Sequence, residues 1–378
     1  MRLLPILIAI LVVCGLHTYV GSRLVAAGML SRSLALPILT ILLAAGVAAM
    51  ILGRRGVGNP FTLTIAWLGY VWLGTLLLLF AASLAGDLWW LGGQLFQFLS
   101  HRDASAAIFW GRRAFASAAL FAALWSLVEA RLPPRLHDVE VEVPGLPAAF
   151  EGFRIAHITD THISLLLGRS WSQSLVARVN ATRPDLVVHT GDFADGPVEP
   201  LTPAVEPFAH LTAPHLFVTG NHESYSNLQA WTTKIRTLGF TVLDNQAYVV
   251  TRGDAHLVIG GVTDFNQGAH FPGSKSDPAK AFSQVPEGPR ILLAHQPRSA
   301  LAAQGLHIAL QLSGHTHGGQ IWPWHFFVRL QQPTNSGFAR LGDVLVFTSR
   351  GVGFWGPPMR LFAPPEVPVL VLRRSVSL

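Results

Sequence analysis

Seven side chains that are able to bind metal ions follow short apolar runs in this chain of 378 residues. They combine imidazole nitrogens, carboxylates and one amide oxygen, a set that suits divalent ions such as Mn²⁺, Fe²⁺ or Zn²⁺. Fourteen of the sixteen His residues lie after residue 135, which also points to metal chemistry in that part of the chain. The candidate ligands are Asp160, His162, Asp192, Asn221, His295, His315 and His317.

Seven ligands are too many for one ion. If one carboxylate is shared, each of two ions has four protein ligands, and open positions remain for water and substrate, as a hydrolytic two-metal site requires. Each residue taken singly is better explained as a buried polar group that is satisfied by hydrogen bonds. The set as a whole predicts a centre with two divalent metal ions.

The elements that must position these ligands are short strands. In open α/β sheets, sites form beyond the carboxyl ends of strands, and glycines beside the ligands allow tight turns. Helical stretches at Trp171–Ala181 and Leu228–Leu238 lie between some of the apolar runs, which favours an α/β domain. An alternating strand is also expected at residues 139–143. The apolar runs are Phe153–Ile158, Leu186–Val188, Leu216–Val218, Leu257–Ile259, Ile291–Ala294, Ile308–Leu312, Val344–Phe347 and Val367–Leu372.

The first 135 residues have a different character. A membrane-spanning helix needs about 20 apolar residues, and four apolar runs predict about four spans here. A cleaved signal peptide for the first run and a buried soluble helical domain for all four are the alternatives. The close succession of the runs favours retained spans, and Pro133-Pro134 ends the last helix. The runs are Leu3–Val20, Leu34–Leu52, Phe61–Leu84 with a potential extension past Asp87 through Trp89–Phe98, and Phe115–Val128.

The net charge of +6 comes from this hydrophobic region. Residues 1–135 hold ten Arg, no Lys and three acids, whereas the remainder holds 17 basic and 18 acidic residues. Arg typically flanks membrane spans, and the near-neutral remainder has no basic stripe to follow a phosphate backbone, so no nucleic-acid partner is expected. With four spans, five Arg lie on each side of the membrane, so charge alone leaves the orientation open.

The order and spacing of the polar motifs resemble the calcineurin-like metallophosphoesterase superfamily. That family has the series D-x-H, G-D-x-x-D, G-N-H-[DE], an isolated His and G-H-x-H. The chain matches the series in order, over roughly residues 153–320, with Asp160–His162, Gly191–Asp195, Gly220–Glu223, His295 and Gly314–His317. Segments at Gly314–Gln320, Ser349–Gly353 and Met359–Pro365 are also similar to a bacterial membrane-associated subgroup.

The resemblance implies a fold, a division of the chain and roles for the ligands. The fold would be a two-sheet αββα sandwich over residues 136–378, joined to the transmembrane helical region of residues 1–135. One ion would bind Asp160, His162, Asp192 and His317. The other would bind Asp192, Asn221, His295 and His315, with Asp192 as the bridge. A metal-bridging hydroxide would then attack phosphorus in line, and His222 would assist the leaving group.

Other residues have less specific expectations. Asp195 and Glu223 are expected to orient a ligand or its neighbour. Arg350, after the Val344–Phe347 run, is a candidate for phosphate binding, and an ion pair is the equal alternative. The aromatic run from Trp322 to Phe327 is either core or a lip that rests on the bilayer, because Trp favours the membrane interface. Such a lip would admit a lipid-linked phosphoester.

The function expected is therefore a metal-dependent phosphoester hydrolase in the cell membrane, with membrane lipid as a partner. The resemblance leans towards an extracytoplasmic catalytic domain. A metallo-β-lactamase-type hydrolase is disfavoured because its H-x-H-x-D-H run is absent. The non-catalytic alternative is a membrane receptor or transporter with a metal-binding domain. All the expected ligands and His222 are present, and isolated charges in the spans are few, which disfavours that alternative.

Overall fold

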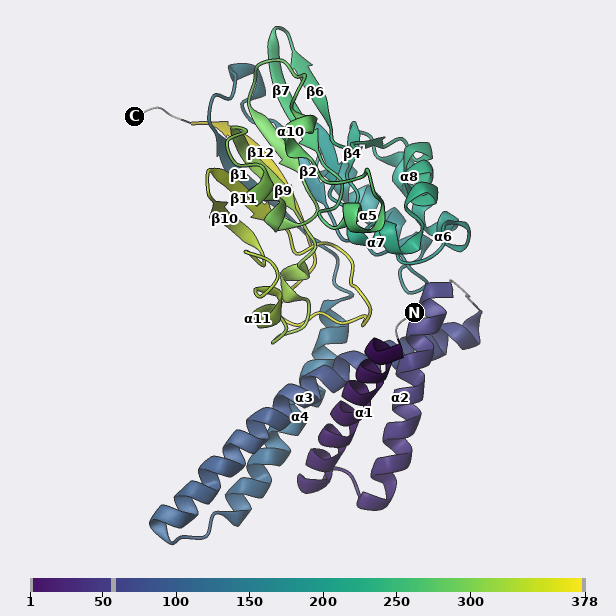
Figure 1. Ribbon diagram of the computed structural model, residues 1–378, viewed down its shortest axis with the longest axis vertical. Helices are drawn as coiled ribbons and strands as arrows, with labels where there is room; N and C mark the ends of the chain where they lie inside the picture. The colour runs from purple at the N-terminus through teal and green to yellow at the C-terminus, as the bar shows by residue number, and fades with distance from the viewer. Residues whose placement is uncertain (1–2, 56–58, 376–378) are drawn as a thin grey trace. The chain divides into compact units, whose positions relative to one another are not determined.

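The computed structural model describes residues 3–55 and 59–375, which fall into two compact units (Figure 1). Among the described residues, the helical unit comprises those up to Leu52, then Asn59–Glu129, and the short segment Gly356–Leu361. The two-sheet unit comprises the others. The division into independent domains at residue 135 stays a prediction, and one late segment of the chain packs with the helices.

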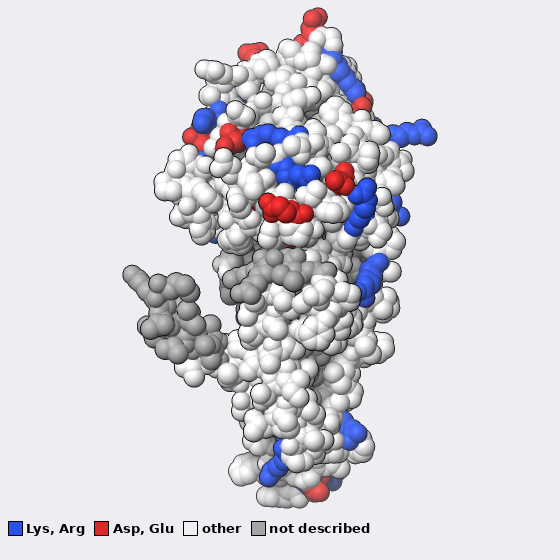
Figure 2. All heavy atoms as spheres, turned by 90° about the vertical axis from the view of Figure 1, so that its right-hand side faces the viewer, with Lys and Arg blue, Asp and Glu red and all other residues white. Residues whose placement is uncertain are grey.

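The helical unit contains four apolar helices, as the sequence predicted. They are α1 (Leu3–Ala26), α2 (Arg32–Arg55), α3 (Pro60–Ser100) and α4 (Ser105–Glu129). By length and composition, Arg32–Leu52, Pro60–Ser100 and Ser105–Glu129 could cross a membrane, and Leu11–Ala26 is a shorter apolar stretch. Figure 2 shows that, on the face in view, most of the surface of this unit carries no charged side chain. The chain is therefore membrane-associated.

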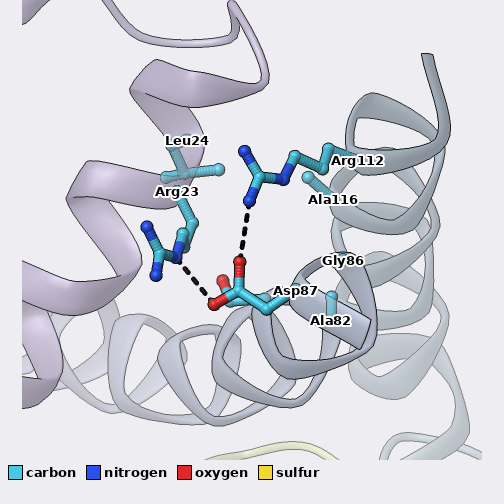
Figure 3. A pocket seen from close by; sticks show the side chains of 8 residues that line it. Arg23, Leu24, Ala82, Gly86, Asp87, Arg112 and Ala116 are labelled. Atoms are coloured by element: carbon cyan, nitrogen blue, oxygen red, sulfur yellow. Dashed lines mark hydrogen bonds and ion pairs between the residues drawn. The ribbon is translucent and has the colours of Figure 1, made fainter. Parts of the chain in front are cut away.

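Helix α3 is longer than any expected run. Asn59 caps its first turn, because the Asn59 side chain accepts from the Thr62 N–H at 2.9 Å. The 41 residues extend past Asp87, as the sequence allowed, and cover about 60 Å at 1.5 Å per residue, twice the hydrocarbon thickness of a bilayer. Figure 3 shows how Asp87 is accommodated: its carboxylate accepts from Arg23 Nε at 2.8 Å and from Arg112 Nη2 at 3.0 Å. Charged groups among apolar helices are usually paired in this way.

Two six-stranded sheets form the other unit, as the family resemblance predicted. The first has the order β1-β12-β2-β3-β4-β5, and the second the order β10-β11-β9-β8-β7-β6. Strands β2 to β5 are parallel, as are β7, β8, β9 and β11, while β12, β10 and β6 each make an antiparallel pair. The first sheet comprises β1 (Arg135–Val143), β2 (Arg154–Ile158), β3 (Leu186–His189), β4 (His215–Phe217), β5 (Thr241–Val242) and β12 (Glu366–Arg374). The second comprises β6 (Gln246–Arg252), β7 (Ala255–Gly261), β8 (Arg290–Leu293), β9 (Ile308–Ser313), β10 (Gly337–Leu341) and β11 (Val344–Thr348).

Three apolar cores hold these layers together. The central core lies between the sheets and joins residues such as Ile155 and Val188 of the first sheet to Ile291 and Leu312 of the second. A second core packs α5 (Arg169–Ala181), α6 (Val198–Val205) and α8 (Leu228–Thr237) on the outer face of the first sheet. The third packs α10 (Pro278–Ala281) and η3 (Pro297–Ala302) on the second sheet. The remaining short elements are η1 (Ala148–Phe150), η2 (Glu206–His210), α7 (Asn221–Ser226), α9 (Gln267–His270), η4 (His317–Gly319) and α11 (His325–Val328).

Candidate metal centre

The carboxyl ends of five strands bring the seven predicted ligands together. Asp160 and His162 follow β2, Asp192 follows β3, and Asn221 follows β4 in the first sheet. His295 follows β8, and the His315/His317 pair follows β9 in the second sheet. Because both sheets contribute strand ends to one edge of the sandwich, residues more than 150 positions apart in sequence become neighbours.

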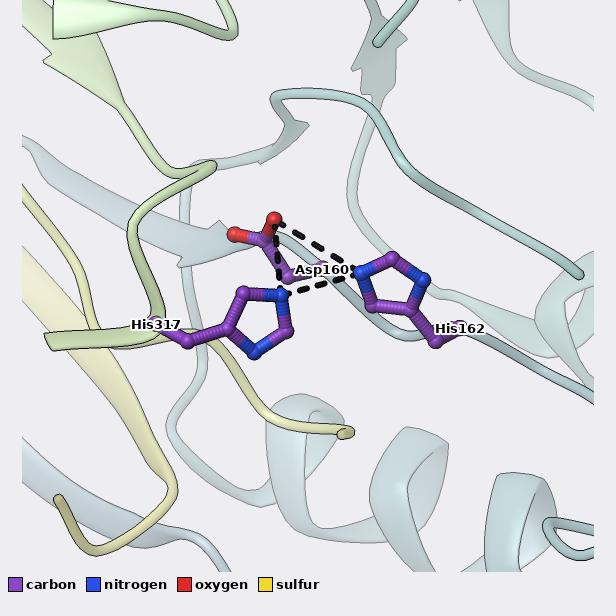
Figure 4. Close-up of side chains that lie close together, drawn as sticks. All are labelled: Asp160, His162 and His317. Atoms are coloured by element: carbon purple, nitrogen blue, oxygen red, sulfur yellow. Dashed lines mark hydrogen bonds and ion pairs between the residues drawn. The ribbon is translucent and has the colours of Figure 1, made fainter. Parts of the chain in front are cut away.

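One cluster consists of Asp160, His162 and His317 (Figure 4). The two imidazole Nε2 atoms lie 3.0 Å apart, and Asp160 Oδ1 is 3.5 Å from the Nε2 of His317 and 3.9 Å from that of His162. His162 Nδ1 is 3.0 Å from Asp195 Oδ1, so this nitrogen donates to the carboxylate. The Nε2 atom of His162 therefore presents its lone pair to the cluster.

The second cluster is centred on His295 Nε2. Asp192 Oδ2 lies 3.1 Å from this atom, Asn221 Oδ1 lies 3.2 Å away, and His315 Nδ1 lies 3.1 Å away. His295 Nδ1 donates to the Thr190 carbonyl at 2.7 Å, so a neutral His295 ring presents only a lone pair at Nε2. This lone pair then faces the oxygens of Asp192 and Asn221, an arrangement that a cation satisfies. The donor chemistry of the residues present therefore fits divalent metal ions.

Electrostatics lead to the same requirement for positive charge. Burial opposes the charged form of His295, but the Asp192 carboxylate outweighs it and raises the pKa of His295 to about 10. Burial lowers the pKa of His315 to about 3, so that ring is a neutral donor. For Asp192, burial works against ionisation, yet His295 and His222 together hold its pKa well below the ordinary value. The Asp192 carboxylate is therefore ionised, and positive charge beside it stabilises it.

Asp192 lies between the two clusters. The same oxygen, Oδ2, is 3.1 Å from His295 Nε2 and 3.7 Å from His162 Nε2. This position suits the bridging role that the resemblance implies, and the full ligand assignment stays a prediction.

The backbone at the centre is held in an uncommon conformation. Left-handed φ angles are infrequent outside glycine, and Asp, Asn and His adopt them more readily than other residues. Such conformations cluster at functional sites, where the surrounding structure maintains them. The ligands with positive φ are Asp160 (53°), His162 (41°), Asp192 (56°), His315 (71°) and His317 (51°).

Two carboxylates support the ligands, as expected for orienting residues. Asp195 Oδ1 accepts from His162 Nδ1 at 3.0 Å and from His222 Nδ1 at 2.6 Å. The fully buried Glu223 accepts from the backbone N–H groups of Asp192, Phe193 and Gly220, at 3.1, 2.7 and 2.6 Å. Burial raises the pKa of Glu223 to about 7. These bonds fix the turn that presents Asp192 to the site.

His222 lies at the open side of the centre. Its side chain is 13% exposed, and its Nε2 is 3.9 Å from Asp192 Oδ2. Burial lowers its pKa, but Asp192 and Asp195 outweigh that effect and raise it to about 9. The rings of Tyr225 and Trp355 lie 5.3 and 6.0 Å from the imidazole. Neither ring was expected beside His222, although Tyr225 is only three positions after His222 on α7.

Two arginines lie close to the ligand turns. Arg350 Nη2 is 3.5 Å from the buried carboxylate of Glu366, and the Arg350 stem packs where Gly318 has no side chain. The ion pair is therefore present, and phosphate binding by Arg350 stays a prediction. Arg298 was missed, although it follows His295 by three positions. Its guanidinium lies 4.3 Å from the Phe265 ring, and its charge contributes, after burial and His295, to the low pKa of His315.

Comparison with known proteins identifies a matching family and several similar chains. The calcineurin-like phosphoesterase family profile matches residues 153–319. A metallophosphoesterase of Aquifex aeolicus is 32% identical over 63% of this chain and 92% of its own length. A transmembrane protein with metallophosphoesterase domain from Danio rerio is 35% identical over 67% of this chain. The solved structure of a Danio rerio dimetal phosphatase covers 53% of this chain and 88% of its own, at 11% identity and a TM-score of 0.34.

This chain belongs to the calcineurin-like metallophosphoesterase family. The match spans 60% of the length of the Danio rerio transmembrane relative. Similar chains are therefore found in vertebrates as well as in bacteria.

Proposed function

We propose that this chain is a metal-dependent phosphoester hydrolase that acts at the membrane. The observation that carries the proposal is the pair of buried ligand clusters on either side of Asp192 Oδ2. Asp160, His162 and His317 would hold one ion with Asp192, and Asn221, His295 and His315 would hold the other with it. When bound, two divalent ions supply a hydroxide nucleophile by lowering the pKa of water, and they neutralise phosphoryl oxygens.

The side chains around the ions orient the reaction. Asp195 holds His222 Nδ1–H, so the Nε2 edge of the ring faces the open side of the centre. From there His222 donates a proton to the leaving oxygen or stabilises its charge while the nucleophile attacks phosphorus in line from the opposite side. Arg350 is the candidate for a bidentate contact with two phosphoryl oxygens. Its ion pair with Glu366 would have to open before this contact could form.

The finer proposal is a lipid-linked phosphoester as substrate. Only residues 130–134 separate the end of α4 from the start of β1, and they span at most about 20 Å. Because this link is short, the catalytic unit stays close to a membrane that the apolar helices enter. Ligand His317 is followed directly by an aromatic segment whose exposed side chains include Trp322, Trp324 and Phe326. Trp at a bilayer surface places its ring at the headgroup level, where a lipid phosphate also lies.

We also propose that the protein is a multi-pass membrane protein with its catalytic unit on the extracytoplasmic side. Four spanning helices would place the start of α1 and the catalytic unit on the same side. Protease protection of an epitope placed after residue 375 in intact cells tests the side, and full protection would contradict the extracytoplasmic placement.

The activity is tested with full-length protein, reconstituted with Mn²⁺ or Zn²⁺ and assayed on mono- and diester reporters and lipid-linked phosphoesters in vesicles. We expect hydrolysis of at least one reporter class and a higher kcat/KM on the lipid-linked esters. Asp192→Asn, prepared in parallel, controls for contaminating hydrolases. If protein with two bound ions hydrolyses none of the panel, the phosphoesterase proposal fails and the receptor or transporter alternative gains support. Preference for soluble esters would remove only the lipid proposal.

A further inference from the structure

Residues 349–365, which we call the strap, join β11 to β12. They run along the loop that follows β2. The strap N–H groups of Val352 and Gly353 donate to the carbonyls of Thr159 and Asp160, at 3.1 and 2.9 Å. A side chain at Gly353 would collide with the Thr161 carbonyl, so this part of the strap fits only without one. The strap therefore follows the loop that carries Asp160 and His162 at backbone contact distance.

Trp355 is the point where the strap passes His222. The Gln320 side chain holds the main chain of Trp355 on both sides: Trp355 N–H donates to Gln320 Oε1 at 2.9 Å, and Gln320 Nε2 donates to the Trp355 carbonyl at 3.0 Å. The indole ring meets the His222 imidazole edge-on, at 80°, and the whole residue is 56% exposed. Tyr225 also lies against His222 and is exposed. Two aromatic rings thus stand beside the group that is proposed to serve the leaving oxygen.

The next residues of the strap, Gly356–Leu361, belong to the helical unit. Met359 is fully buried there, and its sulfur occupies the space where a side chain at Gly74 of α3 would be. Pro357 Cβ would lie 3.0 Å from the same side chain. One position further, the N–H of the fully buried Arg360 donates to the Ser126 carbonyl of α4 at 2.9 Å. The strap is thus anchored on two of the apolar helices, by packing and by a backbone hydrogen bond.

Only three residues of chain separate Trp355 from Met359. We propose that α3 and α4 hold the strap and, through it, keep Trp355 beside His222, so that the helical unit contributes to substrate recognition as well as membrane attachment. Trp355 is then a positioning and specificity residue. Its ring forms an apolar wall on the leaving-group side and favours phosphoesters whose leaving group has an aromatic or extended apolar surface. This inference rests on the proposed phosphoesterase function.

The first test uses full-length, metal-loaded protein and two matched esters, phenyl phosphate and ethyl phosphate, or the diphenyl and diethyl esters if only diesters react. Gly74→Leu should displace Met359. Both Gly74→Leu and Trp355→Ala should reduce the ratio of phenyl-ester to ethyl-ester kcat/KM about two- to tenfold, because stacking of aromatic groups contributes about 0.5–1.5 kcal/mol beyond area burial. Trp355→Phe should keep most of the ratio. Gly92→Leu is the control, because Gly92 lies in the same helix and no atom lies within 4 Å of a Cβ added there.

A second measurement does not depend on activity. Hydrogen exchange at the amides of Val352, Gly353 and Trp355 should accelerate in Gly74→Leu, and in Met359→Ala if Gly74→Leu does not fold, while Gly92→Leu leaves it unchanged. Unaltered exchange in the anchor variants would overturn the strap proposal even if the protein hydrolyses neither ester. Equal losses on both esters in Trp355→Ala would remove the specificity role. Failure of wild-type protein with two bound ions on both esters and on the wider panel would instead count against the phosphoesterase function.

Discussion

At the scale of single residues, the centre is defined by imidazole nitrogens that carry no proton. Thr190 takes the Nδ1 proton of His295, and Asp195 takes those of His162 and His222, so the Nε2 atoms of both ligand imidazoles are free of hydrogen in the neutral rings. Their lone pairs converge with Asp192 Oδ2, which lies 3.1 Å from His295 Nε2 and 3.7 Å from His162 Nε2. Such a set is costly to bury without a cation. Each ligand is thus specified by its neighbour as much as by its own type.

Asp192 and His222 should respond differently to substitution. Asp192→Asn should lose at least one ion and nearly all activity, because the amide lacks the charge that holds both clusters together. His222→Ala should keep both ions and lose activity by about 10²–10⁴-fold, the usual contribution of general acid–base catalysis. Metal content and kcat, measured on the same preparations, check both statements. An empty site in His222→Ala with both ions retained in Asp192→Asn would reverse the assignment.

At the scale of elements, the metal centre depends on turns that leave no room for side chains. Gly314 ends β9, and a side chain there would collide with the Thr159 hydroxyl and with Asp160 Oδ2. The same turn brings the His315 N–H within 3.0 Å of both carboxylate oxygens of Asp160. The turn therefore ties a ligand of one sheet to a ligand of the other.

Gly314→Ala should displace Asp160 and lower metal occupancy, with a loss of unfolding free energy of about 1–3 kcal/mol from overpacking. Gly168→Ala is the matched control, because no atom lies within 4 Å of its added Cβ and its φ of −90° suits alanine. Elemental analysis and thermal unfolding of both variants check the expectation. Full occupancy in Gly314→Ala would show that the Asp160 turn tolerates a side chain.

The sequence allowed most elements near the centre to be predicted, for a physical reason. Buried parallel strands such as β3 and β8 are continuous apolar runs, and their ends carry the polar motifs, so both signals coincide. The edge strands β6 and β10 were missed because none of their residues is fully buried and they mix polar with apolar residues. The place of Trp355 beside His222 and that of Arg298 near the ligand turns could not be predicted, for another reason. Their positions depend on how distant segments of the chain pack, which the spacing of residues in the sequence does not predict.

At the scale of the whole molecule, the number of candidate ligands determines how many metal ions we expect per chain. We expect purified, reconstituted protein to contain about two transition-metal ions per chain, because seven ligands with one bridge complete two four-ligand sites. Elemental analysis after Mn²⁺ or Zn²⁺ loading measures this directly. A maximum of one ion per chain would defeat the dinuclear centre while leaving a mononuclear site possible.

The last prediction concerns the two units. Residues 136–378 alone should fold, bind metal and hydrolyse a small soluble phosphoester, because they contain all seven candidate ligands, His222, both sheets and all three cores around them. Two losses should accompany this activity. Met359 and Arg360 lose their partners in α3 and α4, so the fragment should need detergent and should show the weakened phenyl-ester preference of Gly74→Leu. Activity on a lipid-linked ester should fall as well, because the fragment no longer stays at a bilayer.

The measurement is to express residues 136–378, load the fragment with Mn²⁺ or Zn²⁺, and compare its kcat/KM with that of the full chain on phenyl, ethyl and lipid-linked esters. Full-length Gly74→Leu is the matched control, because it retains the membrane helices and alters only the anchor of the strap. A folded fragment with two ions and no activity on either soluble ester would mean that the helices complete the catalytic site itself. The boundary at residue 135 would then mark a change in amino-acid composition but not a boundary between functions. The strap would be part of the active centre.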